Sequence, residues 1–447
     1  MPSPDPSPAP PAESPLTASH HSHAQLVERY ADGRARLRLT WLMAALSMLG
    51  PFSIDTYLPA FPAMQAALPA SETQMQLSLT VYFIGFAIAS LFHGAISDAV
   101  GRRPVVIATL AIHAAASVGC ALSPSIGALL AFRAIQGCFA GAGFVVGRAV
   151  VRDLFPGDEA QRQLARVQML FALAPIVAPI LGGWLVAHQS WQSIFWCLAA
   201  YGALLALWSH LALPETHPDH LRLSLAVAPL ARTYRRMLFD RRFLLLGAVP
   251  GINFIGFFTY IAGAPAFLMR HLGLSSKDFA VLFIPGIIGI TAAAWWSGRL
   301  AGRIAPRRHV RWGFTVMAVA ALVNLVISSV WPTPLVASPV SSLSAGAGDV
   351  PYAALAAYIL PIATYTFGMA LVTPVLTIKL LDAFAAARGS VSALQSSTHV
   401  ALMAFTTALV VPFAQQSLPR FALTMLLSVT AGALVWHFYL RSHPDSP

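Results

Sequence analysis

The sequence of 447 residues is too apolar for a soluble protein. Hydrophobic residues make up 57% of it and charged residues 10%, whereas soluble domains carry about 25% charged residues. Hydrophobic stretches recur along the whole chain, which excludes a soluble domain with one anchor and predicts a helical membrane protein. The net charge of +11 fits either nucleic-acid binding or the basic loops of membrane proteins. Only the positions of the charges separate these two readings.

Residues 1–38 form a polar segment, rich in proline and histidine at its start, and we predict a disordered tail. The first apolar segment begins near Leu39 and is too long for a signal peptide. Cys120, Cys138 and Cys197 all lie in apolar segments, so they indicate neither a disulfide framework nor a zinc site. No metal site is predicted.

Twelve apolar segments follow, and each is long enough to span a membrane, since a spanning helix needs about 20 residues. They cover residues 39–61, 76–97, 104–123, 125–150, 164–187, 191–213, 243–268, 279–298, 310–331, 353–378, 390–412 and 419–440. We therefore predict an all-α integral membrane protein with two six-helix bundles, at 39–213 and 243–440. A basic cytoplasmic linker at 214–242 joins them, a flexible external loop lies at 332–352, and a cytoplasmic tail covers 441–447.

The cations support this count of spans. With both termini in the cytoplasm, 23 of the 28 Lys and Arg residues fall on the cytoplasmic side and only Arg270, Lys277 and Arg420 fall outside. Such a bias is what the positive-inside rule demands. The net charge therefore reports orientation, and no basic–aromatic pattern suggests a nucleic-acid partner.

Asp55 is the carboxylate that lies clearly inside a predicted span. A charge near the hydrocarbon core costs at least ~2.5–3.5 kcal/mol, so Asp55 is expected to face an interior cavity, where a carboxyl group can exchange a proton. Arg133, in the fourth span, is its candidate partner. Both residues lie about 9–12 Å below the same membrane surface, counted along their helices. We therefore expect Asp55 and Arg133 to form a buried pair or to share a water-filled cavity with a role in transport. The alternative is an ion pair that only stabilises the bundle.

A second group of charges follows the second span. Asp98, Gly101, Arg102 and Arg103 form a glycine-containing turn, and Asp153 at the cytoplasmic end of the fourth span is a candidate partner for Arg102. Such a cluster could lock one conformation of a carrier, although ordinary interfacial charges are the alternative. A similar spacing from glycine to a basic pair recurs after the eighth span, at residues 298–308, and such parallel repeats are typical of two-bundle transporters.

The fifth span combines prolines with small residues. Its Pro175 and Pro179 remove backbone donors and favour a kink. Its Gly182 and Gly183 permit close helix packing.

Together these elements resemble a known family. The turn after the second span is similar to the loop signature of the major facilitator superfamily, and Arg133 with Gln136 and Gly137 resembles its second motif. The fifth-span pattern is similar to the proline-glycine motif of its drug/proton antiporters. The stretch from Asp55 to Met64 resembles the first-helix signature of the bicyclomycin and chloramphenicol resistance subfamily.

The resemblance implies a bacterial inner-membrane antiporter that works by alternating access, with the proton gradient in place of a cofactor. It implies proton coupling by Asp55 with Arg133, and a gating cluster of Asp98, Arg102 and Asp153. The expected partners are protons, the lipid bilayer and a small, largely apolar substrate, and the chain is expected to be a monomer. Candidate substrate contacts are Tyr57, Gln136, Asn253, Tyr260, Tyr365 and Gln395.

Three other functions compete with this hypothesis. A facilitator or exporter of a specific metabolite would keep the same fold but need a more polar pocket. A membrane enzyme would need a catalytic cluster, and no metalloprotease, nucleophile-elbow or phosphate-loop pattern is present. A receptor or scaffold with an inactive transporter fold would show no flux driven by a pH gradient.

Overall fold

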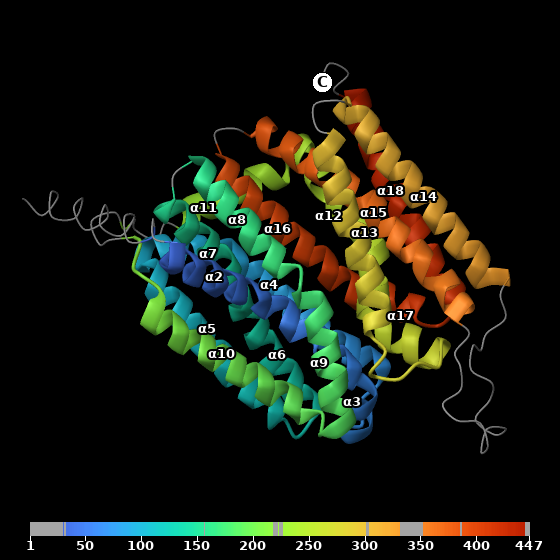
Figure 1. Ribbon diagram of the computed structural model, residues 1–447, viewed down its shortest axis with the longest axis horizontal. Coiled ribbons are helices and arrows are strands. Elements are labelled where there is room, and N and C mark those ends of the chain that lie inside the picture. Colours follow the sequence, from blue (N-terminus) through green and yellow to red (C-terminus); the bar gives the residue numbers. More distant parts are fainter. Residues whose placement is uncertain are drawn as a thin grey trace, which may run out of the picture.

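The computed structural model describes Tyr30, residues 33–155, 157–217, Arg222, and residues 227–300, 304–330, 352–384 and 387–442. These residues form helices and turns without a β-strand (Figure 1). Twelve of the helical segments are long and apolar enough to cross a membrane, which confirms the predicted all-α fold with twelve spans. The predicted tail up to residue 29, the linker residues 218–221 and 223–226, and the loop at 331–351 lie outside the described residues.

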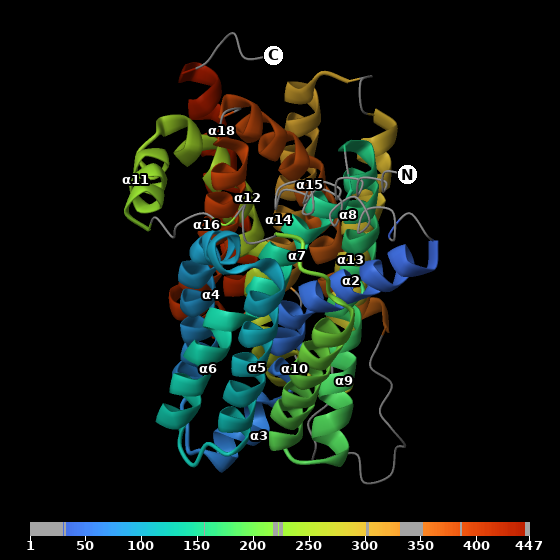
Figure 2. The same cartoon turned by 90° about the vertical axis from the view of Figure 1, so that its left-hand side faces the viewer.

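The first half of the chain contains six spans, several of which are built from two consecutive helices. Its elements are α2 (Gly33–Asp55), η1 (Leu58–Ala60), α3 (Phe61–Ala67), α4 (Glu72–Val100), α5 (Arg102–Ala121), α6 (Ile126–Ala140), α7 (Ala142–Leu154), α8 (Gly157–Phe171), α9 (Ala174–His188) and α10 (Gln192–Ala212). Within this half, α4 packs on α6 and α5 packs on α10 (Figure 2).

The second half repeats the arrangement after a connecting helix, α11 (Val227–Leu238). Its elements are α12 (Arg241–Ala262), η3 (Pro265–His271), α13 (Ala280–Leu300), α14 (Pro306–Val330), α15 (Tyr352–Ala383), α16 (Arg388–Phe405), η5 (Thr406–Val410), α17 (Val411–Ala414) and α18 (Leu418–Ser442). Here α12 packs on α18, and α15 packs on both α13 and α14. The bundle boundaries at 39–213 and 243–440 themselves stay a prediction.

Two helical segments lie where the sequence predicts none. Helix α2 begins at Gly33, inside the segment predicted to be a disordered tail. Helix α11 occupies part of the predicted linker. Both segments carry several arginines. The prediction searched for apolar residues, so it ended each element where the charged residues begin. The helices themselves continue beyond the hydrocarbon region.

The first span is broken in its middle, directly after Asp55. Helix α2 ends at this residue, and a short 3₁₀ turn at Leu58–Ala60 precedes α3. Pro59 has no amide hydrogen to offer the carbonyl of Asp55, so the α-helical ladder cannot continue there. The Thr56 hydroxyl donates to the backbone oxygen of Phe52, which also accepts from the Thr56 amide. The break therefore places Asp55 at a helix end within the membrane-spanning region.

The two halves meet where α4 packs against α16, η5 and α17 and where α9 packs against α13. One side of the molecule carries α11, with Arg232, Arg235 and Arg236, and the first turn of α5, with Arg102 and Arg103; we call it the basic side. In Figure 1, α11 lies at the upper left, whereas α3 lies near the bottom, on the opposite side.

Candidate functional site

A central cavity of about 530 Å³ lies between the two halves. Its walls come from α2, α4, α7, α8 and α9 on one side and from α12, α13, α15 and α16 on the other. Aromatic rings dominate the lining: it includes Phe83, Phe86, Phe144, Phe171, Phe254, Phe257, Phe258 and Phe283. A cavity of this size and character suits a small, mainly apolar molecule.

Asp55 supplies the one carboxyl group among the described residues that line this cavity. The residue is only 6% exposed. Its carboxyl group has no hydrogen-bond or ion-pair partner among the described residues. An ionisable group held in apolar surroundings without a partner is costly, which is the usual mark of a functional position in a membrane protein.

Arg133 does not pair with Asp55 in this structure. Its side chain is fully buried in the first half, where the guanidinium donates to the carbonyl oxygen of Ser53 at 3.0 Å and to the side chain of Gln136. The same group lies between the rings of Tyr57 and Tyr82, at 4.7 and 4.3 Å from their centroids. These contacts hold the charge inside the bundle, and Arg133 does not line the cavity.

Most of the predicted substrate contacts also lie away from the cavity. Gln136 donates to Ser117 at 2.7 Å, and the Tyr57 hydroxyl lies 2.7 Å from that of Ser78. Tyr260 accepts a hydrogen bond from Asn324 at 2.6 Å, and Tyr365 donates to the backbone oxygen of Asn253 at 2.8 Å. The Asn253 side chain packs against Gly432. The bonded groups pair within one half, so they serve packing in this structure, whereas the Asn253 amide is buried without a hydrogen-bond partner among the described residues.

Gln395 is the member of that group that lines the cavity. It donates to the Thr377 hydroxyl at 3.2 Å. Nearby on the same wall lies His399, whose ring centroid is 4.7 Å from that of Phe254. Sequence reasoning expected an apolar lining from the abundant phenylalanines but missed Thr377, because a lone hydroxyl group in an apolar helix carries little signal. The spacing of Gln395 and His399 on one helical face is the signal that could have found this wall.

The small residues of α9 allow two close approaches. A Cβ atom on Gly182 would overlap the backbone oxygen of Thr56, in the first span, and one on Gly183 would overlap that of Ser276, in the second half. Pro175 lines the cavity and Pro179 is buried. Gly183 thus lets the two halves touch on the side opposite the basic side.

Further contacts close that opposite side. Gln76 donates to the backbone oxygen of Ala262 at 3.1 Å, and the hydroxyl groups of Thr80 and Thr407 lie 2.9 Å apart. Arg270 forms an ion pair with Glu72. Each contact joins one half to the other.

On the basic side, the central cavity continues into a second space of about 640 Å³, which we call the vestibule. The two spaces share Ser90, Phe144, Val145 and Ser396 in their linings. The described structure is therefore closed on one side, while its cavity leads to the vestibule on the other.

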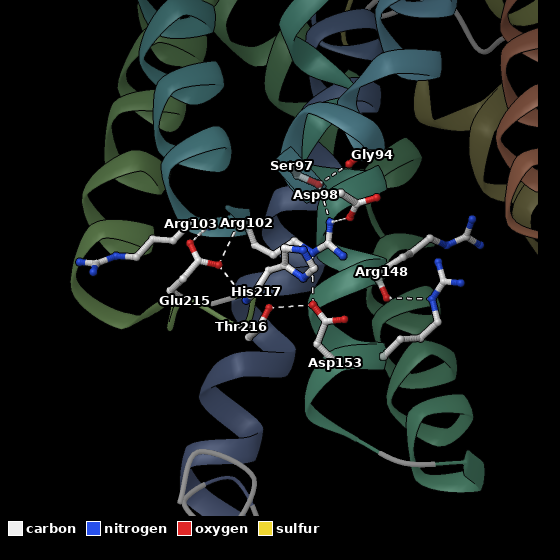
Figure 3. Close-up of polar contacts among 11 residues, drawn as sticks. Gly94, Ser97, Asp98, Arg102, Arg103, Arg148, Asp153, Glu215, Thr216 and His217 are labelled. Carbon is white, nitrogen blue, oxygen red and sulfur yellow. Dashed lines mark hydrogen bonds and ion pairs between the residues drawn. The ribbon is translucent and has the colours of Figure 1, made fainter. Parts of the chain in front are cut away.

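The predicted charge cluster lies in the wall of this vestibule (Figure 3). Arg102 forms ion pairs with Asp98 and, at 3.2 Å, with Asp153. Gly101 has a φ of +112°, a conformation that favours glycine, and it ends α4 so that α5 can start at once. Glu215 accepts from the backbone amides of Arg102 and Arg103 at 3.0 and 3.1 Å.

A helical protein with twelve membrane-spanning segments and a central cavity between two halves is a membrane transporter in its architecture. Residues 41–408 match the family model of the Major Facilitator Superfamily. The chain belongs to this superfamily. It is therefore a transporter of a small molecule and not an enzyme.

Several bacterial proteins are similar to the chain. It is 36% identical to the uncharacterized MFS-type transporter YdgK of Bacillus subtilis over 300 residues. The aligned residues cover 67% of this chain and 75% of that protein. It is 28% identical to the bicyclomycin resistance protein homolog of Haemophilus influenzae, over 65% of this chain and 74% of that protein. Multidrug resistance protein MdtL of Escherichia fergusonii is 31% identical, over 64% of this chain and 71% of that protein.

Solved structures of distant sequence share the fold. The D-xylose-proton symporter superposes with a TM-score of 0.66 at 14% identity, covering 90% of this chain and 97% of that one. The nucleoside transporter NupG gives a TM-score of 0.67 at 12% identity, covering 90% of this chain and 99% of that one. At such low identity these likenesses establish the fold alone.

Proposed function

We propose that the chain exports small, largely apolar compounds across a bacterial inner membrane in exchange for protons. The observation that carries this proposal is Asp55, a partnerless carboxyl group in an otherwise uncharged, phenylalanine-rich cavity. The names of the relatives, which include multidrug and bicyclomycin resistance proteins, support drug compounds as the substrate class. The proton gradient drives transport without a cofactor.

The orientation follows from the cations. The basic side faces the cytoplasm, as the positive-inside rule requires, and both termini lie there. The described conformation is then inward-facing, with the vestibule open to the cytoplasm. The cavity is enclosed within one chain, so a monomer suffices for transport.

The mechanism is competition at Asp55. In the inward-facing state the ionised carboxylate binds a hydrogen-bonding group of the substrate, while the phenylalanine rings bind its apolar body. In the outward-facing state a proton neutralises the carboxylate and weakens substrate binding. Exchange requires that proton and substrate have different affinities in the two states. The cluster of Arg102 with Asp98 and Asp153 lies within the first half and favours one of the two states.

Asp55→Asn tests the proposal, because asparagine keeps the shape and hydrogen bonding of the side chain but cannot release a proton. We expect the variant to lose pH-gradient-driven export of chloramphenicol and bicyclomycin from everted vesicles of a pump-deficient bacterium. It should keep exchange of one substrate molecule for another. Asp240→Asn, at the N-terminus of α12 and outside the cavity lining, is the matched control and should retain driven export, because asparagine can also accept the hydrogen bond from the Arg242 amide. Full-rate driven export by Asp55→Asn would overturn the proposal and favour a facilitator.

A further inference from the structure

Two arginines of the vestibule have no carboxylate partner in the described part of the chain. Arg148 and Arg152 line this space, and neither takes part in an ion pair there. Arg152 donates its Nε–H to the backbone oxygen of Arg148 at 3.4 Å, a contact that leaves both charges uncompensated. The two carboxylates of the lining, Asp98 and Asp153, are both bound to Arg102. The vestibule therefore carries an excess of positive charge.

Arg148 places this charge at the passage into the central cavity. Its guanidinium lies over the ring of Phe144, 4.5 Å from the centroid. Phe144 belongs to the linings of both the vestibule and the central cavity. Figure 3 shows the Arg148 side chain pointing away from the cluster formed by Asp98, Arg102 and Asp153. A compound that moves from the vestibule towards Asp55 must pass this cation.

We propose that Arg148 and Arg152 form a charge filter that admits uncharged and anionic compounds in preference to cations. This inference rests on the proposed export function and names its substrate class: uncharged aromatic compounds with a hydrogen-bonding group, rather than lipophilic cations. A fixed charge in a narrow opening with low-dielectric walls repels ions of its own sign and concentrates those of the opposite sign. An uncharged substrate also agrees with competition at Asp55, since a hydroxyl or amide donor binds the carboxylate more strongly while it is ionised than after it takes up a proton.

The potential at the passage can be measured without knowing the substrate. In a background in which Cys120, Cys138 and Cys197 are replaced by alanine, Ser396→Cys puts a thiol where the vestibule and the cavity share their lining. The purified full-length protein is reacted at low ionic strength with cationic trimethylammonioethyl methanethiosulfonate and with anionic sulfonatoethyl methanethiosulfonate. Each rate is divided by the rate of the same reagent with mercaptoethanol in solution.

We expect the normalised rate of the anionic reagent to exceed that of the cationic one. Combining Arg148→Gln with Arg152→Gln should lower this anion-to-cation ratio by about tenfold, because each lost charge acts with opposite sign on the two reagents. The lysine variants at both positions should preserve the ratio. The rate with uncharged methyl methanethiosulfonate should not change, which shows that the passage keeps its shape.

Arg311→Gln provides the matched control, since it removes an arginine on the exposed surface of α14, outside the vestibule lining. It should leave the ratio unchanged. A normalised ratio near one in the parental protein, or a ratio that the double glutamine variant does not move, would overturn the charge filter. The labelling rates do not depend on proton coupling. If the ratio behaves as expected but Asp55→Asn retains full driven export, the antiport mechanism is refuted and the charge filter stands.

Discussion

Replacing Gly183 by alanine should open the side of the molecule that is closed in this structure. A Cβ atom at this position would overlap the backbone oxygen of Ser276 and lie 3.0 Å from its carbonyl carbon. Both atoms belong to the backbone of the second half, so no side-chain rotation can relieve the overlap. The halves must part by a fraction of an ångström or more. Overpacking of this kind costs ~1–3 kcal/mol, which shifts a two-state equilibrium about fivefold to 150-fold.

Gly182→Ala separates this effect from simple damage to the fold. Its Cβ atom would overlap the backbone oxygen of Thr56, which lies in the same half. The strain is then present whether the halves are together or apart, so we expect a lower unfolding temperature without a change in the conformational equilibrium. Gly389→Ala, in α16, where no atom lies within 4 Å of the added Cβ, should neither shift the conformational equilibrium nor lower the unfolding temperature.

The assay is a distance measurement between spin labels at two exposed positions on the closed side. Thr73→Cys and Gln416→Cys lie in different halves and are exposed. In the cysteine-free background, double electron–electron resonance should report a longer distance population for Gly183→Ala and the parental distribution for Gly182→Ala. If Gly183→Ala leaves the distribution unchanged, contact between α9 and the segment before α13 does not hold this side closed.

Two further predictions follow from the charged groups. Arg133→Lys should lose ~1–3 kcal/mol of stability in thermal unfolding, because an ammonium group cannot both stack between Tyr57 and Tyr82 and donate to Ser53; an unchanged unfolding temperature would contradict this. Burial lowers the pKa of His271, which lies on the closed side beside Arg270. The folded protein thus favours the neutral ring, and the unfolding temperature should fall as pH drops below about 6.5; this fall should be smaller in His271→Asn.

The sequence predicts how deep a residue lies along a membrane-spanning helix. It does not predict which way the side chain points around the helix axis. The depths of Asp55 and Arg133 are similar when counted in residues, yet their side chains face different surroundings. The break after Asp55 turns the chain, so that Asp55 faces the cavity while Tyr57 lies against Arg133. Depth alone could not show this, because one residue of a helix rotates the side-chain direction by about 100°.

The cluster on the basic side was easier to predict for a physical reason. Asp98 and Arg102 are close in sequence, on either side of the turn at Gly101, so their proximity needs little tertiary information. The second-half candidates lacked such a constraint. Asn253 and Tyr365 are polar residues in apolar helices, and a buried polar group bonds inside a bundle as readily as it faces a cavity. Only Gln395 faced the cavity.

The closed side combines contacts that are individually weak, as a carrier requires. The Arg270–Glu72 ion pair is partly exposed, and such pairs contribute about 0–1 kcal/mol. The contacts of Gln76 with Ala262 and Thr80 with Thr407 are buried hydrogen bonds, each contributing a net ~0.5–1.5 kcal/mol. The approach at Gly183 adds packing that a single methyl group would remove. A closure of this strength amounts to a few kcal/mol, so the binding of one proton or one substrate molecule is enough to reverse it.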